Sequence, residues 1–200
     1  MEELILSGTV ENDIFHSYNF EFKQGINIVI GKNGCGKTSL LKSICDIKKN
    51  NGSVLLNKKT INKHIYSYYF SGDLLGEEDM TLKENIYYNI EFKENQVLEE
   101  YKKLIEIFEL QKYENIIYKK ASEGMKQKMH IIICLLHKKA ITIMDEPFNY
   151  LDERSCKEFV LYLNENQKMH SNMIIIATNE LSIINEFEQK RIINIEGDFK

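Results

Sequence analysis

Short runs of apolar residues alternate along this chain with longer segments in which apolar residues recur every three to four positions. The short runs predict buried strands, and the longer segments predict amphipathic helices. Together these elements predict one α/β domain, for which 200 residues supply a sufficient core. Strands are expected around Leu4–Leu6, Phe20–Phe22, Ile26–Ile30, Val54–Leu56, Ile65–Phe70, Ile141–Met144, Met173–Thr178 and Ile192–Ile195.

Two of the predicted helices have distinct sequence signatures. Thr81 and Glu84 form a capping box, the arrangement that opens a helix. Farther along, apolar residues share one face of the next helix, at Val97, Tyr101, Leu104, Ile105 and Phe108. The remaining helices are expected from Ser39, over Met125–Leu136, around Arg154–Leu163 and near Leu181–Phe187.

Composition and charge exclude several classes of function. The net charge is −4 without a basic block, so nucleic acid is not expected as a partner. The longest apolar stretches have about six residues, whereas a membrane span needs ~18. Any membrane channel must then be another chain. The four cysteines lack metal-ligand spacing, and we interpret Cys35, Cys45, Cys134 and Cys156 as reduced thiols of a cytosolic protein.

Residues Gly31–Thr38 match the phosphate-loop pattern G-x-x-x-x-G-K-[ST], between a predicted strand and a predicted helix. Glycines allow a tight turn whose N–H groups point at phosphate oxygens, and the helix N-terminus adds positive potential. Lys37 can reach the β- and γ-phosphates from a surface loop, and the Thr38 hydroxyl can ligate Mg²⁺. A plain glycine turn is the alternative. The expected nucleotide contacts are Gly31, Lys32, Asn33, Gly34, Cys35, Gly36, Lys37, Thr38 and Ser39.

A second motif places two carboxylates directly after the strand Ile141–Met144. Asp145 is expected to hold the Mg²⁺ shell. Glu146 is placed to polarise a water molecule for attack on the γ-phosphate. Taken alone, these residues also fit an acidic turn after a core strand, but a phosphate loop upstream favours the catalytic interpretation.

A third motif, Ala121–Lys128, lies at the start of the helix that precedes this strand. Ser122 can simply cap that helix. The segment also resembles the signature of ATP-binding cassette (ABC) ATPases, with Ser122 and Gly124 at matching positions. Together with the order and spacing of the other two motifs, it makes the chain similar, over nearly its full length, to an ABC transporter ATP-binding subunit.

The resemblance implies an α/β fold: a P-loop NTPase core of mainly parallel sheet with flanking helices, a small antiparallel β subdomain and an inserted helical subdomain. The helical subdomain would span about residues 79–125, with the core and β subdomain at about 1–78 and 126–200. ATP and Mg²⁺ are the implied cofactors. A second ATPase subunit, in a homodimer or heterodimer, and an integral-membrane permease are the implied partners. The protein would lie on the inner face of the cell membrane.

Three residues depart from the family pattern. Ser71 stands where the family usually has a glutamine, and Asn179 stands where it has a histidine that contacts the γ-phosphate. The Asn179 amide can donate a hydrogen bond but carries no charge. Glu123 places a carboxylate in the signature, where the resemblance implies that a phosphate held by the facing subunit would lie nearby. Phe15 is the nearest candidate for stacking on adenine, although a core phenylalanine is the simpler interpretation.

The sequence therefore predicts an ATPase that powers a separately encoded permease. The short chain and the Ser-x-Gly-Met-x-Gln form of the signature favour an exporter. A soluble ABC-type ATPase with a regulatory or assembly role is one alternative, and a small-molecule P-loop kinase is another. Co-purification of a membrane protein would distinguish the transporter from the soluble module, and a phosphorylated product would identify the kinase.

Overall fold

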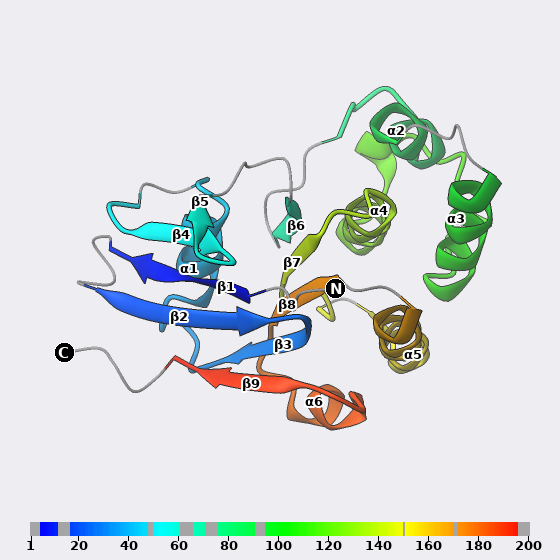
Figure 1. Ribbon diagram of the computed structural model, residues 1–200. Coiled ribbons are helices and arrows are strands. Elements are labelled where there is room, and N and C mark those ends of the chain that lie inside the picture. Colours follow the sequence, from blue (N-terminus) through cyan, green and yellow to red (C-terminus); the bar gives the residue numbers. More distant parts are fainter. Residues whose placement is uncertain are drawn as a thin grey trace.

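A five-stranded parallel sheet forms the centre of the computed structural model (Figure 1), which describes residues 5–11, 17–47, 50–60, 66–70, 76–90, 95–149, 151–169 and 172–195. Its strands, in spatial order, are β6 (Tyr66–Phe70), β7 (Ile141–Asp145), β8 (Met173–Ala177), β3 (Gly25–Ile30) and β9 (Arg191–Asn194). Asp145 on β7 and Val29 on β3 both pair with Ala177 on β8. The carboxyl ends of these three strands therefore meet at one edge of the sheet.

A second, antiparallel sheet covers one side of this core (Figure 1). Its order is β2 (Tyr18–Lys23), β1 (Ile5–Val10), β4 (Ser53–Leu56) and β5 (Lys59–Thr60). Alternate residues of β2 are buried and exposed, as expected for a sheet with one solvated face. The mainly parallel core and the small antiparallel sheet confirm the predicted fold class.

Two hydrophobic clusters lie on opposite faces of the parallel sheet, because successive side chains of a strand point to opposite sides. On one face, α1 (Lys37–Ile44) packs between the two sheets through Leu40, Leu41 and Ile44. The other face is covered by α4 (Glu123–Leu136) and α5 (Glu153–Met169), and α6 (Leu181–Glu186) follows β8. The phosphate-loop helix is thus held by apolar contacts on both sides.

Two helices lie farther out, beyond α4 (Figure 1). They are α2 (Leu82–Asn89) and α3 (Asn95–Ile107), followed by a short 3₁₀ turn at Tyr118–Lys120. The capping box predicted for α2 is present: Glu84 N donates to Thr81 Oγ1 at 3.1 Å, and Thr81 N donates to Glu84 Oε2 at 2.8 Å. These elements fall within the range expected for a helical subdomain, whose boundaries remain a prediction.

Several element boundaries differ from the sequence prediction. β1 continues to Val10 through polar residues, because its backbone pairs with β2 and β4 on both sides. α5 continues to Met169, six residues beyond the last predicted apolar position, Leu163. β8 ends at Ala177 rather than Thr178. The strand β5 and the 3₁₀ turn carry no signal that the pattern of apolar residues could reveal.

Candidate functional site

The phosphate loop connects β3 to α1 at the carboxyl edge of the parallel sheet. Gly34 and Gly36 have φ angles of 82° and 100°, in the left-handed region that side chains disfavour. A Cβ atom at Gly34 would meet no atom within 4 Å, so the backbone angle, not crowding, calls for glycine there. Gly36 caps α1, and its carbonyl accepts from Leu40 N at 2.8 Å. The loop therefore leads directly into a helix N-terminus, the kind of position that binds anions.

The Lys37 side chain does not project from a surface loop as the sequence suggested, since only 7% of it is exposed. Its Nζ donates to Gly31 O at 2.8 Å and to Lys32 O at 3.4 Å. The ammonium also lies 3.8 Å from Glu146 Oε1. The lysine is buried because the loop carbonyls and this carboxylate surround its charge.

Thr38 and Asp145 come together from α1 and the end of β7. Thr38 Oγ1 donates to Asp145 Oδ2 at 2.7 Å, and Asp145 is 3% exposed. A hydroxyl and a carboxylate side by side are hard oxygen donors, the kind that Mg²⁺ prefers. Their position beside the phosphate loop suits an ion shared between the protein and a phosphate, so the residues present fit this metal.

Glu146 has a φ of 48°, which is uncommon for a residue with a side chain. Its N–H donates to Ala177 O at 2.8 Å, so β7 and β8 hold the backbone at this bend. The carboxylate is half-buried, and burial raises its pKa, while nearby Lys37 opposes that rise. A raised pKa suits a group that accepts a proton from water.

Asn179 lies beside the phosphate loop. Its Nδ2 donates to Asn33 Oδ1 at 2.7 Å, across 146 residues of sequence. One further residue of this edge, Thr178, was not singled out from the sequence. Thr178 is fully buried, and a hydrogen bond from its side chain lowers the pKa of Glu146. Asn33 was expected as a nucleotide contact of the loop, but its hydrogen bond to Asn179 was not. The position of Thr178 at the end of an apolar run was the one available signal.

The signature segment begins α4. Ser122 is the N-cap, and its Oγ accepts from Met125 N at 3.3 Å, so the capping alternative describes this structure correctly. A hydroxyl that accepts this capping hydrogen bond can still donate its own proton, so Ser122 can cap the helix and also contact a nucleotide. The Glu123 carboxylate folds along the helix to Lys126 Nζ at 2.8 Å. This ion pair partly offsets the negative charge at the helix N-terminus.

Two predicted contacts lie outside the described residues: Ser71 and Phe15. The structure brings together the phosphate loop, Asp145, Glu146 and Asn179, and it places the signature residues Ser122 and Gly124 separately, at the start of α4. The four cysteines are free thiols, as expected. No helix among the described ranges is long and apolar enough to cross a membrane.

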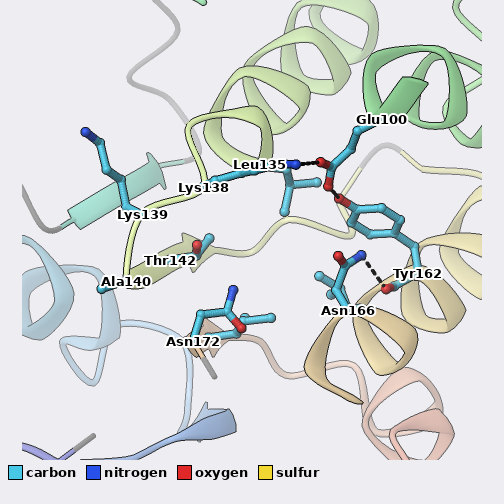
Figure 2. A pocket seen from close by; sticks show the side chains of 11 residues that line it. Glu100, Leu135, Lys138, Lys139, Ala140, Thr142, Tyr162, Asn166 and Asn172 are labelled. Atoms are coloured by element: carbon cyan, nitrogen blue, oxygen red, sulfur yellow. Dashed lines mark hydrogen bonds and ion pairs between the residues drawn. The ribbon is translucent and has the colours of Figure 1, made fainter. Parts of the chain in front are cut away.

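A cavity of about 280 Å³ lies at the opposite edge of the sheet (Figure 2). It opens where β7 and β8 begin, so it is distinct from the phosphate loop, which lies beyond the carboxyl ends. Figure 2 shows Glu100 beside it, between two partners. Tyr162 Oη donates to Glu100 Oε1 at 2.5 Å, and Lys138 Nζ lies 2.5 Å from Glu100 Oε2. These contacts tie α3 to α5 and to the segment that follows α4.

The chain is similar to known ATP-binding proteins. The sequence model of the ABC transporter family matches residues 15–149. An aliphatic sulfonates import ATP-binding protein of Bacillus thuringiensis is 30% identical over 179 residues, which cover 86% of this chain and 69% of that protein. A putative ABC transporter ATP-binding protein of Pyrococcus horikoshii is 27% identical over 198 residues, which cover 94% of this chain and 76% of that protein.

The fold agrees with these sequence matches. A solved structure of an ATP-binding subunit of an ABC transporter superposes with a TM-score of 0.78, at 19% identity, and covers 96% of this chain and 86% of that one. The phosphate loop, the carboxylates after β7 and the helix at the signature segment occur in one chain with that fold. This protein therefore belongs to the ABC transporter family, as one of its ATP-binding ATPase subunits.

Proposed function

We propose that the chain binds Mg·ATP at the carboxyl edge of its parallel sheet and hydrolyses it with Glu146 as the general base. The observation that carries this proposal is the convergence of two pairs. Lys37 Nζ lies 3.8 Å from Glu146 Oε1, and Thr38 Oγ1 donates to Asp145 Oδ2 at 2.7 Å. A cation for phosphate, oxygens for a metal and a carboxylate for water are thereby assembled within one small region.

Each residue of this region has a separate task. The loop amides and Lys37 bind and orient the phosphates. Thr38 and Asp145 would hold Mg²⁺, which neutralises charge on the phosphate oxygens. Glu146, whose pKa is raised by burial, takes the proton of the attacking water. Asn179 would donate a hydrogen bond to the γ-phosphate from the end of β8.

The start of α4 would complete the site of a facing subunit. Ser122 caps this helix, and Gly124 lies in its first turn, where the positive end of the helix attracts an anion. The partner is a second ATPase subunit, identical or related, bound head to tail so that each ATP lies between two chains. The pairing of Glu123 with Lys126 makes this helix terminus compatible with a bound phosphate.

Hydrolysis in this dimer would drive an integral-membrane permease at the inner face of the cell membrane. For the direction of transport there are two candidates. The form of the signature favours export, whereas the Bacillus thuringiensis relative is named as an import protein, which favours import. Identification of the membrane protein that co-purifies from detergent-solubilised native membranes, followed by uptake into inside-out vesicles, distinguishes the two directions.

The central test of the proposal is the variant Glu146→Gln. Loss of a general base lowers turnover by about 10²–10⁴-fold while Mg·ATP binding is retained. The trapped ATP should also stabilise a dimer, detectable by size-exclusion chromatography. Glu99→Gln is the matched control, because Glu99 is an exposed residue of α3 paired only with Lys102 in the described contacts. Wild-type turnover in Glu146→Gln removes the residue from the mechanism, and absence of ATP binding by the unmodified chain refutes the function.

A further inference from the structure

The hydrogen bond between Asn33 and Asn179 joins two segments that the fold brings to one place. Asn33 lies in the loop after β3, and Asn179 is the second residue after β8. β3 and β8 are neighbouring parallel strands, with Val29 opposite Ala177, and Thr178 N extends the ladder by donating to Val29 O at 3.1 Å. Asn179 therefore leaves the sheet directly beside the phosphate loop.

The direction of this hydrogen bond matters chemically. Asn179 Nδ2 is the donor and Asn33 Oδ1 is the acceptor, 2.7 Å apart. A neutral amide has an attractive end and a repulsive end for phosphate, since its NH₂ group donates and its carbonyl oxygen only accepts. By accepting from Nδ2, Asn33 turns the NH₂ end of Asn179 toward the phosphate loop. Within the part of the chain that the structure describes, this is the one hydrogen bond described for that NH₂ group, and its second hydrogen can serve another acceptor.

We propose that Asn33 is a positioning residue, whose side chain fixes the orientation of the Asn179 amide so that its NH₂ group faces the γ-phosphate. This inference rests on the proposed function and adds a task that the phosphate-loop pattern does not assign to Asn33. A residue at position 179 without a charge binds phosphate only in one of its two amide orientations. Asn33 presents its carbonyl oxygen to this amide, so the opposite orientation of Asn179 would bring two acceptor oxygens together.

A positioning role for Asn33 predicts different effects of its substitution on ATP binding and on turnover. Backbone amides of the loop and the Lys37 ammonium provide most of the attraction for ATP, and the Asn33 side chain is not needed for either. Asn33→Ala should therefore lower kcat by about fivefold, the equivalent of one typical net hydrogen bond, and leave the Kd for ATP nearly unchanged. Asn179→Ala should have the same effect.

The decisive experiment is a double-mutant cycle on the full chain. It measures phosphate release at saturating Mg·ATP and the Kd for ATP for wild type, Asn33→Ala, Asn179→Ala and the double variant. The double variant should be no slower than Asn179→Ala alone, because Asn33 acts through Asn179. Asn89→Ala is the control, since the exposed Asn89 also makes an amide hydrogen bond, from its Nδ2 to Asn85 O at 2.8 Å, but belongs to α2 and not to the parallel sheet or its phosphate loop. Multiplicative effects, or wild-type kcat in Asn33→Ala, would overturn the proposal.

A second measurement does not depend on turnover. The NMR resonances of the Asn179 NH₂ group should shift when wild type binds Mg²⁺ with a non-hydrolysable ATP analogue, and this shift should be lost in Asn33→Ala. An equal shift in both proteins overturns the positioning role. If the wild type binds the analogue but releases no phosphate from ATP, hydrolysis fails as the proposed function, while the NMR comparison still decides the role of Asn33.

Discussion

Lys37 of the phosphate loop and Glu146 after β7 form an ion pair, with Nζ 3.8 Å from Oε1. The lysine also donates to the carbonyls of Gly31 and Lys32, so its charge is shared among three acceptors of the protein itself. An incoming phosphate must compete with these acceptors. ATP binding should therefore loosen the pair and free the carboxylate for water.

Replacement of this lysine tests the competition. Lys37→Ala should abolish detectable ATP binding in calorimetry, because it removes the ammonium that lies at the loop carbonyls and would neutralise phosphate charge. It should lower the free energy of unfolding by about 1–2 kcal/mol, since two loop carbonyls lose a charged donor. Lys102→Ala, which removes an exposed lysine of α3, is the control. Wild-type ATP affinity in Lys37→Ala would show that this loop does not bind phosphate.

The hydrogen bond between Thr38 and Asp145, the two residues that would hold Mg²⁺, predicts a difference between two substitutions of Thr38. Thr38→Val removes the hydroxyl that donates to Asp145 and nearly preserves the shape, whereas Thr38→Ser keeps the hydroxyl. The valine variant should need at least about tenfold more Mg²⁺ for half-maximal ATP affinity, an effect typical of disturbing a metal site. Titrations of ATP affinity against Mg²⁺ check this. Coincident curves for Val and Ser variants would exclude the hydroxyl as a ligand.

The backbone of Glu146 predicts a stability effect separate from catalysis. At a φ of 48°, a residue with a Cβ atom is strained by about 1–2 kcal/mol, and glycine is not. Glu146→Gly should therefore unfold at higher urea than Glu146→Ala, although both lack the carboxylate.

A helical glutamate provides the matched control for this comparison. Glu158 is exposed within α5, where glycine is less stable than alanine by about 1 kcal/mol. The order of the two variants should therefore reverse between positions 146 and 158. The same order at both positions would contradict a strained backbone at Glu146.

His130 on α4 predicts how stability depends on pH. Burial lowers the pKa of His130 to about 4, from an ordinary 6.5, so the folded protein keeps it neutral. Between pH 6.5 and 4 the unfolded chain binds a proton that the folded one does not, and the free energy of unfolding falls as pH falls. The loss attributable to this residue approaches about 3 kcal/mol at pH 4.

The variant His130→Gln isolates this contribution. Urea unfolding of wild type and variant at pH 7 and at pH 4 gives the free energy of unfolding of each protein, and so the amount that each loses between the two pH values. The variant should lose less stability than wild type over this interval, because glutamine does not titrate. If both proteins lost the same free energy of unfolding, His130 would not contribute to the loss of stability in acid.

The sequence was informative wherever a local pattern decided the structure. Apolar runs predicted the buried strands β3, β7 and β8, since strands covered on both faces are apolar throughout. Thr81 and Glu84 predicted the start of α2 because a capping box is complete within four residues. The sequence was less informative about where helices end. α5 continues to Met169 through polar residues, which do not show the regular spacing of apolar positions that marks a helix.

The candidate site shows the same division between local and tertiary information. The phosphate loop and the Asp145–Glu146 pair were readable as motifs. The Asn33–Asn179 hydrogen bond was not, because it depends on which strands are neighbours in the sheet. The burial of Lys37 and the left-handed backbone of Glu146 also arise only when β7 and β8 pair beside the loop.

The parallel sheet has a consequence for the synthesis of this protein. Thr38 and Asp145 are 107 residues apart in the chain, and Asn33 and Asn179 are 146 residues apart. Such distant contacts form slowly and only after loop closure, so the growing chain cannot assemble this pocket while β8 is still inside the ribosome. ATP, which stabilises only the state that binds it, can then act as a late ligand of newly released chains and favour those that have completed the sheet.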